Sequence, residues 1–241
     1  MIALVDADVL GYRIAFACKD EELSVAKHRL NSFIADILTH EVDTVYEDCF
    51  VDSWKLFLTG KNNFRYKLAT IAPYKGNRTS PKPAHLPALR KHLVDEWGAV
   101  VIDGQEADDA IAIEATALGD SCVMVSVDKD FDQIPGWHYN FVKKLGYYVT
   151  PQQGLYSFYK QLLTGDSADN IMGLKGIGPV KADKILSSVD ISQLPIDDIN
   201  EALYELCFTA YEEDSEELIE TARLLWLRRK PDELWMPPTK G

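Results

Sequence analysis

The chain has 241 residues, a hydrophobic fraction of 46% and a formal net charge of −13. This length is enough to bury one large core, or one core with a small appended module. No apolar stretch approaches a membrane span, the start lacks the basic leader of a secretory signal, and the 4 cysteines are widely scattered. This excludes a membrane protein and a disulfide scaffold, and we expect a cytoplasmic protein with reduced thiols.

Short apolar runs alternate with helical patterns along most of the chain. The predicted strands are Ile2–Asp6, Trp54–Leu58, Ala99–Ile102 and Cys122–Val127, and the predicted helices are Val9–Lys19, Leu23–Glu47 and Glu106–Leu118. This alternation predicts an α/β fold with a mostly parallel central sheet flanked by helices, whose ligands bind outside the carboxyl ends of the strands. From about Tyr156 the pattern changes to helices and Gly-rich turns. We therefore expect an α/β core over residues 1–155, with a mobile bridge region at 65–90, and a helical part over 156–241.

The charge is unevenly distributed along the chain. Taken alone, a net charge of −13 argues against nucleic acid as a partner, because polyanions are bound mostly by Lys and Arg. The segment from residue 61 to residue 90 contains no acidic residue, and its basic residues are Lys61, Arg65, Lys67, Lys75, Arg78, Lys82 and Arg90. A basic strip beside carboxylates is what metal-assisted phosphodiester chemistry would require.

Four acidic clusters follow predicted strands or open predicted helices. They are Asp6, the group Glu106, Asp108 and Asp109, the pair Asp128 and Asp130, and the pair Asp166 and Asp169. In a helix, residues three apart share a face, so Glu106 could meet Asp109 and Asp166 could meet Asp169. In an extended segment, residues two apart share a face, so Asp128 could meet Asp130. Any one cluster is more often a helix cap or a loop, but together they are the hard oxygen ligands that suit Mg²⁺ or Mn²⁺.

Two further segments could contact nucleic acid. In Leu174–Ala182, Gly176 and Gly178 allow the backbone to approach a phosphate, the following helix offers free N–H groups, and Lys181 adds charge. An ordinary helix-turn-helix with glycine caps explains this segment equally well. In Ala72–Arg78, Tyr74, Lys75 and Arg78 fit contact with a strand backbone and stacking on a base, although such a segment alone is usually a polar loop.

Taken in order, these motifs resemble the 5′ nuclease superfamily, which includes flap endonucleases, the 5′ nuclease domain of DNA polymerase I and phage-type 5′–3′ exonucleases with RNase H activity. The resemblance covers Asp6 to about Leu186 and includes, besides the clusters above, Leu10–Arg13, Phe64–Arg65 and Gly173–Ala182, which matches the superfamily's helix–three-turn–helix. It implies a nuclease core with a helical bridge over the active site.

The resemblance also implies roles for individual residues. Asp6, Glu106, Asp108, Asp109, Asp128, Asp130, Asp166 and Asp169 would be carboxylates for two or more Mg²⁺ ions. Arg13, Lys75 and Arg78 would contact the scissile or a neighbouring phosphate, and Tyr74 would stack on a terminal base. Gly176, Gly178 and Lys181 would grip duplex DNA, around a K⁺ ion. The expected partner of this monomer is DNA with 5′ ends, flaps or nicks, or an RNA–DNA hybrid, and the expected reaction is two-metal hydrolysis.

Two departures from the superfamily pattern stand out. The second core strand of the superfamily commonly ends with an aspartate, and the matching position here is assigned to Gly60, which removes one ligand. Asp8 could compensate, although a helix N-cap is the simpler interpretation. The lysine after the Gly-rich turn is displaced by one residue to Lys181. Two alternative functions remain: a metal-dependent RNA nuclease of the PIN type, and a DNA-binding module without catalysis.

Overall fold

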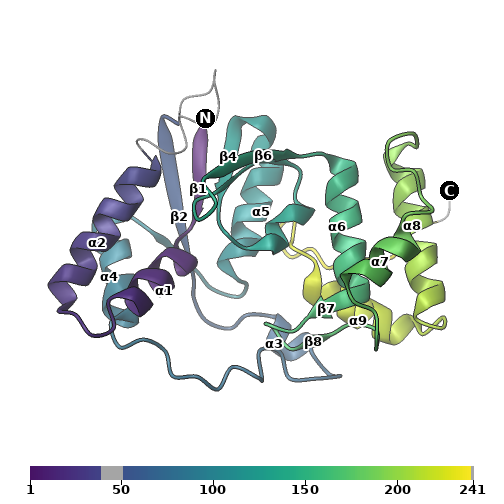
Figure 1. The fold of residues 1–241 in the computed structure, drawn as a ribbon, viewed down its shortest axis with the longest axis horizontal. Coiled ribbons are helices and arrows are strands. Elements are labelled where there is room, and N and C mark those ends of the chain that lie inside the picture. The colour runs from purple at the N-terminus through teal and green to yellow at the C-terminus, as the bar shows by residue number, and fades with distance from the viewer. Residues whose placement is uncertain (39–50, 240–241) are drawn as a thin grey trace. The chain divides into compact units, whose positions relative to one another are not determined.

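The computed structural model describes residues 1–38 and 51–239 (Figure 1). The chain forms two compact units, which are described separately. Unit 1 contains residues 1–63, 80–131 and 136–148, and unit 2 contains residues 64–79, 132–135 and 149–241. None of the helices in the described part of the chain has the length and apolar character of a membrane span.

The sheet of unit 1 has six strands in the order β3-β2-β1-β4-β5-β6. The strands are β1 (Ile2–Asp6), β2 (Ser53–Thr59), β3 (Val100–Ile102), β4 (Cys122–Val125), β5 (Gly136–Asn140) and β6 (Leu145–Val149). The pairs β1–β2, β1–β4, β2–β3 and β4–β5 are parallel. The predicted α/β class, the mostly parallel sheet and the first four strands are therefore confirmed, whereas β5 and β6 were not predicted.

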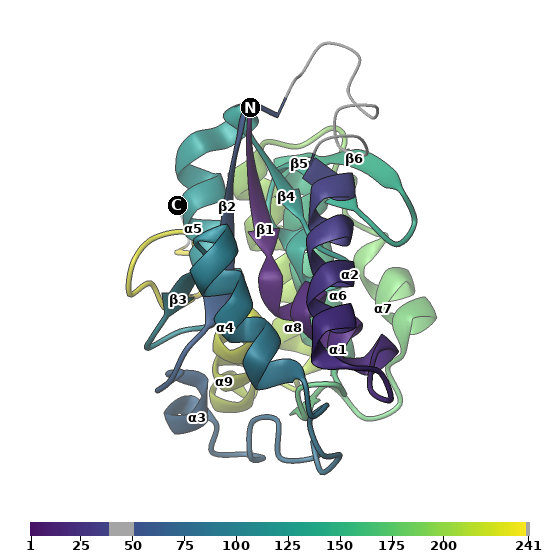
Figure 2. The same cartoon turned by 90° about the vertical axis from the view of Figure 1, so that its left-hand side faces the viewer.

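Helices cover both faces of this sheet (Figures 1 and 2). The helices α1 (Ala7–Ala17), α2 (Leu23–Asp36) and α4 (Leu86–Trp97) pack together. Val5 of β1 and Val125 of β4 belong to the hydrophobic core that these helices form. α5 (Ala107–Leu118) packs on β1 to β4. Since successive side chains of a strand point to opposite faces, α5 covers the other side. The helix predicted over residues 23–47 ends at Asp36, and the part from residue 39 lies outside the described residues.

Unit 2 is mainly helical, with its own hydrophobic core. Its elements are α3 (Arg65–Leu68), α6 (Pro151–Thr164), the two-stranded sheet of β7 (Gly165–Asp166) and β8 (Ile171–Met172), α7 (Pro179–Leu186), α8 (Ile196–Ala210) and α9 (Ser215–Leu225). Thr150 and Gln153 form a capping box that begins α6, with Pro151 in the first turn. The core brings Phe158, Leu203 and Leu218 together, each fully buried.

Part of the bridge region, expected to be a mobile connection, is packed and hydrogen-bonded within unit 2. Arg65 is 2% exposed, and its guanidinium donates hydrogen bonds to the carbonyl oxygens of Leu224 and Trp226. Further along, Glu220 of α9 accepts hydrogen bonds from the backbone N–H groups of Thr70 and Ile71. Residues 64–79 are thereby fixed within unit 2. The predicted domain boundary at residue 155 stays a prediction.

Candidate functional site

Asp6 lies at the carboxyl edge of the unit 1 sheet, on the strand between β2 and β4. It is both the last residue of β1 and the N-cap of α1, and it is 6% exposed. Its Oδ1 accepts a hydrogen bond from the Val9 N–H at 3.3 Å, and its Oδ2 accepts one from the Ser126 hydroxyl at 3.0 Å. The change from strand to helix at this residue therefore places a buried carboxylate where a parallel sheet binds ligands.

The charge on Asp6 is poorly compensated by the protein. Burial, and next to it the negative charge of Asp8, raise the pKa of Asp6 from 3.8 to about 7. Asp128 acts in the same direction, while the hydrogen bonds from Ser126 and Val9 lower the pKa. A bound cation would offset this accumulation of negative charge.

Asp128 and Asp130 follow β4, in a turn that differs from the prediction. Residues Lys129–Gln133 form a 3₁₀ turn, so the extended segment expected for Asp128 and Asp130 is wrong. The Asp130 N–H donates to Asp128 Oδ1 at 3.0 Å, and the Asp128 N–H donates to the Ser126 hydroxyl at 3.1 Å. Since Ser126 also donates to Asp6, this serine links the two carboxylate positions. No role was assigned to Ser126 from the sequence, although it lies two residues before Asp128, in the third acidic cluster.

Glu106 and Asp109 meet at the start of α5, as predicted for residues three apart in a helix. Glu106 is the N-cap, and the two side chains form a capping box with the backbone N–H groups. They are 7% and 0% exposed. The Asp108 carboxylate accepts a hydrogen bond from the Asp109 N–H at 2.7 Å. The capping role explains their position in the helix, and burial of two acidic side chains goes beyond what an ordinary surface cap requires.

In unit 2, Asp166 ends β7 and Asp169 lies in the turn that joins β7 to β8. The predicted helix start at these residues is therefore wrong. Asp166 accepts the Ala168 N–H at 2.8 Å within the turn. Asp169 forms ion pairs with Lys75, at 3.4 Å, and with Arg78, and it accepts a hydrogen bond from the Tyr74 hydroxyl at 2.7 Å.

Backbone groups join the same two segments of unit 2. The Lys75 N–H donates to the Asp169 carbonyl at 2.8 Å, the Asn77 amide to the Ser167 carbonyl at 2.6 Å, and the Asn170 amide to the Pro73 carbonyl at 2.9 Å. The cations predicted to contact phosphate are thus held in place by the hairpin turn. Neither Asn77 nor Asn170 was singled out from the sequence.

Tyr74 is 5% exposed, and its ring packs edge to face against Tyr66. Stacking of Tyr74 on a base stays a prediction, and it would require the ring to leave this packing. Arg13 lies on the exposed side of α1. The residues Tyr12 and Phe16 lie on either side of it in the sequence, and their rings stack with their centroids 6.3 Å apart and are 42% and 58% exposed. These two rings were not singled out from the sequence.

The Gly-rich turn of unit 2 leads into α7. Gly176 has φ +79°, a conformation that favours glycine, and Gly178 is the N-cap of α7. The Lys181 ammonium donates to the Gly176 carbonyl at 2.8 Å. The turn therefore presents a helix N-terminus with a lysine folded across it, while duplex binding and a K⁺ ion at this turn stay predictions.

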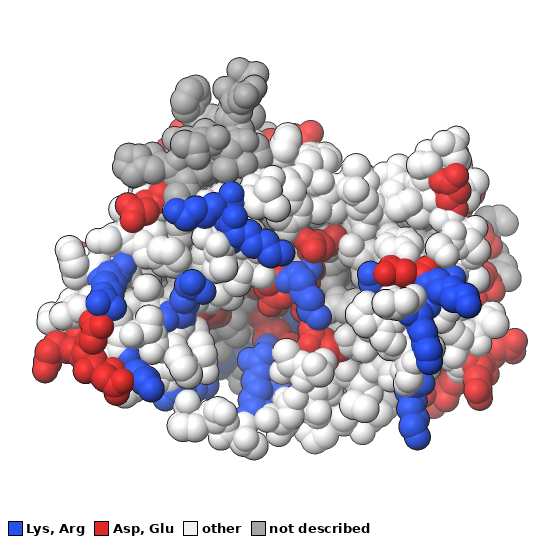
Figure 3. Space-filling model, in the orientation of Figure 1, with Lys and Arg blue, Asp and Glu red and all other residues white. Residues whose placement is uncertain are grey.

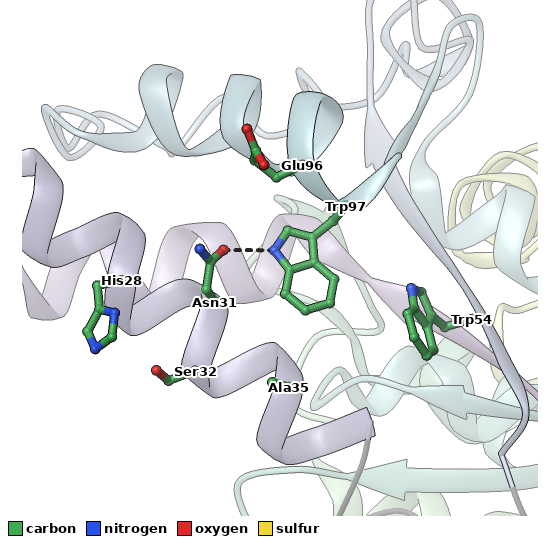
Figure 4. Close-up of a pocket in the computed structure, with 7 residues that line it drawn as sticks. All are labelled: His28, Asn31, Ser32, Ala35, Trp54, Glu96 and Trp97. Atoms are coloured by element: carbon green, nitrogen blue, oxygen red, sulfur yellow. Dashed lines mark hydrogen bonds between the residues drawn. The ribbon is translucent and has the colours of Figure 1, made fainter.

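Unit 1 also contains a cavity of about 530 Å³ away from these carboxylates (Figure 4). It is lined by His28, Asn31, Ser32, Ala35, Trp54, Glu96 and Trp97. Because it is open and contains no residue of the acidic clusters, we do not assign the predicted chemistry to it.

On the face drawn in Figure 3, Lys and Arg side chains lie beside Asp and Glu despite the net charge of −13.

Comparison with known proteins shows to which family the chain belongs. No family model matches the chain. It is 32% identical over 206 residues to the flap endonuclease Xni of Shewanella woodyi, covering 75% of this chain and 68% of that protein. The chain belongs to the 5′ nuclease superfamily. It is also 30% identical over 204 residues to a thermostable DNA polymerase I of Thermus caldophilus, of which it spans only 24%.

Solved structures of this superfamily share the fold. T5 5′-exonuclease with bound zinc has a TM-score of 0.63 at 18% identity, covering 93% of this chain and 88% of that chain. The catalytic core of Rad2 in complex with a DNA substrate has a TM-score of 0.53 at 14% identity, covering 100% of this chain and 81% of that chain.

One 5′ nuclease feature is placed differently from our assignment. β2 ends at Thr59, and Gly60 lies one residue beyond the strand. A Cβ on Gly60 would clash with the Asp103 carboxylate and lie 2.7 Å from the Ile102 carbonyl oxygen, so no side chain fits there. The residue that ends the second strand is therefore a threonine, whose hydroxyl accepts the Ala107 N–H at 3.0 Å and anchors the start of α5. Nor is Asp8 the helix N-cap, since Asp6 has that role.

Proposed function

We propose that this protein is a divalent-metal-dependent 5′ nuclease that hydrolyses phosphodiester bonds near the 5′ ends of DNA, at flaps and nicks, and in RNA–DNA hybrids. The observation that carries the proposal is the buried Asp6 at the carboxyl edge of the unit 1 sheet, whose negative charge is poorly compensated and which is linked through Ser126 to Asp128. The similarity to a flap endonuclease over 68% of its length supports the same activity. We further propose that the protein acts as a monomer in the cytoplasm.

The donor set fits Mg²⁺ or Mn²⁺. Among the described residues, no group of three His, Cys, Asp or Glu side chains is arranged to hold one ion by itself. Mg²⁺ does not require such a group, because it commonly keeps several waters and binds through one or two carboxylates together with substrate phosphates. Asp6 and Asp128 would hold such an ion in unit 1, and Glu106, Asp108, Asp109 and Asp130 would bind further ions or order their waters.

The chemistry is divided between the ions and the side chains. When bound, two ions would supply a water of lowered pKa and charge stabilisation for the leaving 3′ oxygen. Ser126 orients the Asp6 carboxylate by donating a hydrogen bond to it. In unit 2, Lys75 and Arg78 would exchange their contact with Asp169 for a phosphate, and Arg13 would contact phosphate from α1. We propose Asp166 and Asp169 as further metal carboxylates, and the turn of Gly176, Gly178 and Lys181 as a duplex grip that holds a K⁺ ion.

Cleavage of labelled substrates tests this function. We expect the protein to release short products from 5′-labelled flap and nicked DNA in Mg²⁺ and none in EDTA. Asp128→Asn should lower the rate at least a hundredfold, because it removes a metal carboxylate, while binding of the same DNA in EDTA persists. The matched control is Asp95→Asn, an exposed carboxylate on α4 that pairs only with Lys91 among the described residues and should leave the rate unchanged.

The same panel distinguishes the two alternatives. Cleavage of single-stranded RNA in preference to flap DNA would indicate a PIN-type RNA nuclease. Tight flap binding without cleavage in Mg²⁺ or Mn²⁺ would indicate a DNA-binding module. Either result would contradict the proposal.

A further inference from the structure

β2 contributes no carboxylate at its carboxyl end, and the Asp103 carboxylate beside Gly60 accepts the Lys61 N–H at 2.6 Å. Thr59 ends the strand, and Gly60 has no room for a side chain. The Thr59 hydroxyl is engaged with the Ala107 N–H, next to Glu106. This corner of the unit 1 sheet, at the end of β2, lies directly beside β1, whose last residue is Asp6.

Asp8 and Arg90 occupy this corner as an ion pair. Asp8 Oδ2 accepts the Thr59 N–H at 2.7 Å, and Asp8 Oδ1 accepts a hydrogen bond from the Arg90 guanidinium. Arg90, on α4, also donates to the Thr59 carbonyl oxygen. Three residues from the start of α1, the end of β2 and α4 are thus joined in a closed ring of hydrogen bonds. The Asp8 and Arg90 side chains are only 28% and 30% exposed.

The pairing determines which charge the corner presents. A guanidinium remains protonated at every pH at which proteins fold, and its planar fork fits two acceptors at once. Both oxygens of Asp8 already accept hydrogen bonds, and the nearest cation to them is part of the protein. A metal ion at this corner would have to approach a permanent positive charge and compete with it for Asp8.

We propose that Arg90 is a built-in cation of the carboxylate edge: it supplies at the end of β2 the positive charge that a bound metal ion would supply, and it keeps Asp8 from binding metal. This inference rests on the proposed metal dependence of the protein. Arg90 is a positioning residue for the carboxylate edge, and its effect is on metal binding at that edge.

Titration of the metal-free protein with Mn²⁺, followed by calorimetry and by the spin-resonance signal of free Mn²⁺, tests the inference without any cleavage. In Arg90→Leu, the released Asp8 carboxylate should raise Mn²⁺ affinity about tenfold or add one bound equivalent, because a neighbouring positive charge is lost. Arg90→Gln serves the same purpose if the leucine variant does not fold. Arg90→Lys keeps the charge and should bind Mn²⁺ within about twofold of the wild type.

Two controls separate the role of Asp8 from a general loss of charge. In the double variant Asp8→Asn with Arg90→Leu, the gain in Mn²⁺ binding should disappear. Lys91→Leu removes the next cation along α4, an exposed one that pairs with Asp95, and should leave Mn²⁺ binding unchanged.

Unchanged or weaker Mn²⁺ binding in folded Arg90→Leu and Arg90→Gln would overturn the inference, since Arg90 would then be structural or would orient Asp8 as a ligand. An equal gain in Lys91→Leu would overturn it as well. Failure of the proposed function is a different result, namely a wild-type protein that neither binds Mn²⁺ nor cleaves DNA.

Discussion

At the scale of single residues, the position of Asp6 lowers the stability of the fold at neutral pH. It is buried at a strand end, close to other carboxylates, and its pKa is raised to about 7 from 3.8. A group whose pKa is higher in the folded state than in the unfolded state favours folding at low pH, and this advantage is lost as the pH rises through the folded pKa. A cation-binding site would lower the stability of the folded protein at neutral pH when no cation is bound.

This argument predicts a pH-dependent stability difference between the wild type and Asp6→Asn in EDTA. The advantage of the asparagine variant in unfolding free energy should grow by roughly 2–3 kcal/mol between pH 5 and pH 8, because only the wild type must bury a charge. Urea unfolding at both pH values measures it. A difference that does not change with pH would show that Asp6 is ionised throughout this range, and Asp95→Asn is the matched control.

Lys75 offers a second test at this scale. The ion pair with Asp169 fixes the position of the Lys75 ammonium, so Lys75 should contribute to the reaction rate more than to DNA affinity. Lys75→Ala should lower the single-turnover rate at saturating DNA by roughly a hundredfold, comparable to loss of other electrostatic transition-state donors. Lys67→Ala, an exposed lysine of the same segment, is the control and should weaken binding alone. An unchanged saturated rate in Lys75→Ala would reduce Lys75 to a residue that attracts DNA.

At the scale of elements, a substitution in the Gly-rich turn before α7 can test DNA binding without disturbing the fold. A Cβ at Gly178 would meet no atom within 4 Å, so a side chain is tolerated by the fold. Gly178→Val should nevertheless weaken binding to nicked duplex at least tenfold more than binding to single strands, because the added side chain keeps phosphate away from the N–H groups of α7. Fluorescence anisotropy measures both affinities. Equal losses on the two substrates would contradict a duplex grip here.

The elements also show how far the sequence alone could lead. Continuous apolar runs predicted β1 to β4 because buried parallel strands have that pattern. β5 and β6 were missed because their residues mix apolar and polar types, and β5 is defined by pairing with β4. Asp166–Asp169 has the spacing of a helix start, and the pairing of β7 with β8, Gly165 with Met172 and Asp166 with Ile171, makes it a hairpin. Asp8 and Arg90 are 82 residues apart, and no local pattern predicts their ion pair.

At the scale of the whole molecule, a net charge of −13 must be reconciled with binding to a polyanion. The structure shows that several cations of the basic strip are already engaged. Arg65 is buried against carbonyl oxygens, Arg90 pairs with Asp8, and Lys75 and Arg78 pair with Asp169. Long-range attraction of DNA should therefore be weak, and affinity should come from a few local contacts by exposed lysines.

The salt dependence of DNA binding tests this distribution of charge. Each lysine that contacts a phosphate adds about one to the slope of log affinity against log salt. Lys67 and Lys82 are exposed, so Lys67→Ala and Lys82→Ala should each reduce the slope by about one. Arg90→Ala should leave the slope unchanged, because Arg90 stays bound to Asp8 and never releases a counterion from DNA. Anisotropy titrations of a labelled flap in EDTA, between 50 and 300 mM KCl (roughly the range over which such slopes are measured), supply the three slopes. A loss in Arg90→Ala equal to that in Lys67→Ala would mean that DNA displaces Asp8 from its arginine, and that the basic strip acts as a single binding surface.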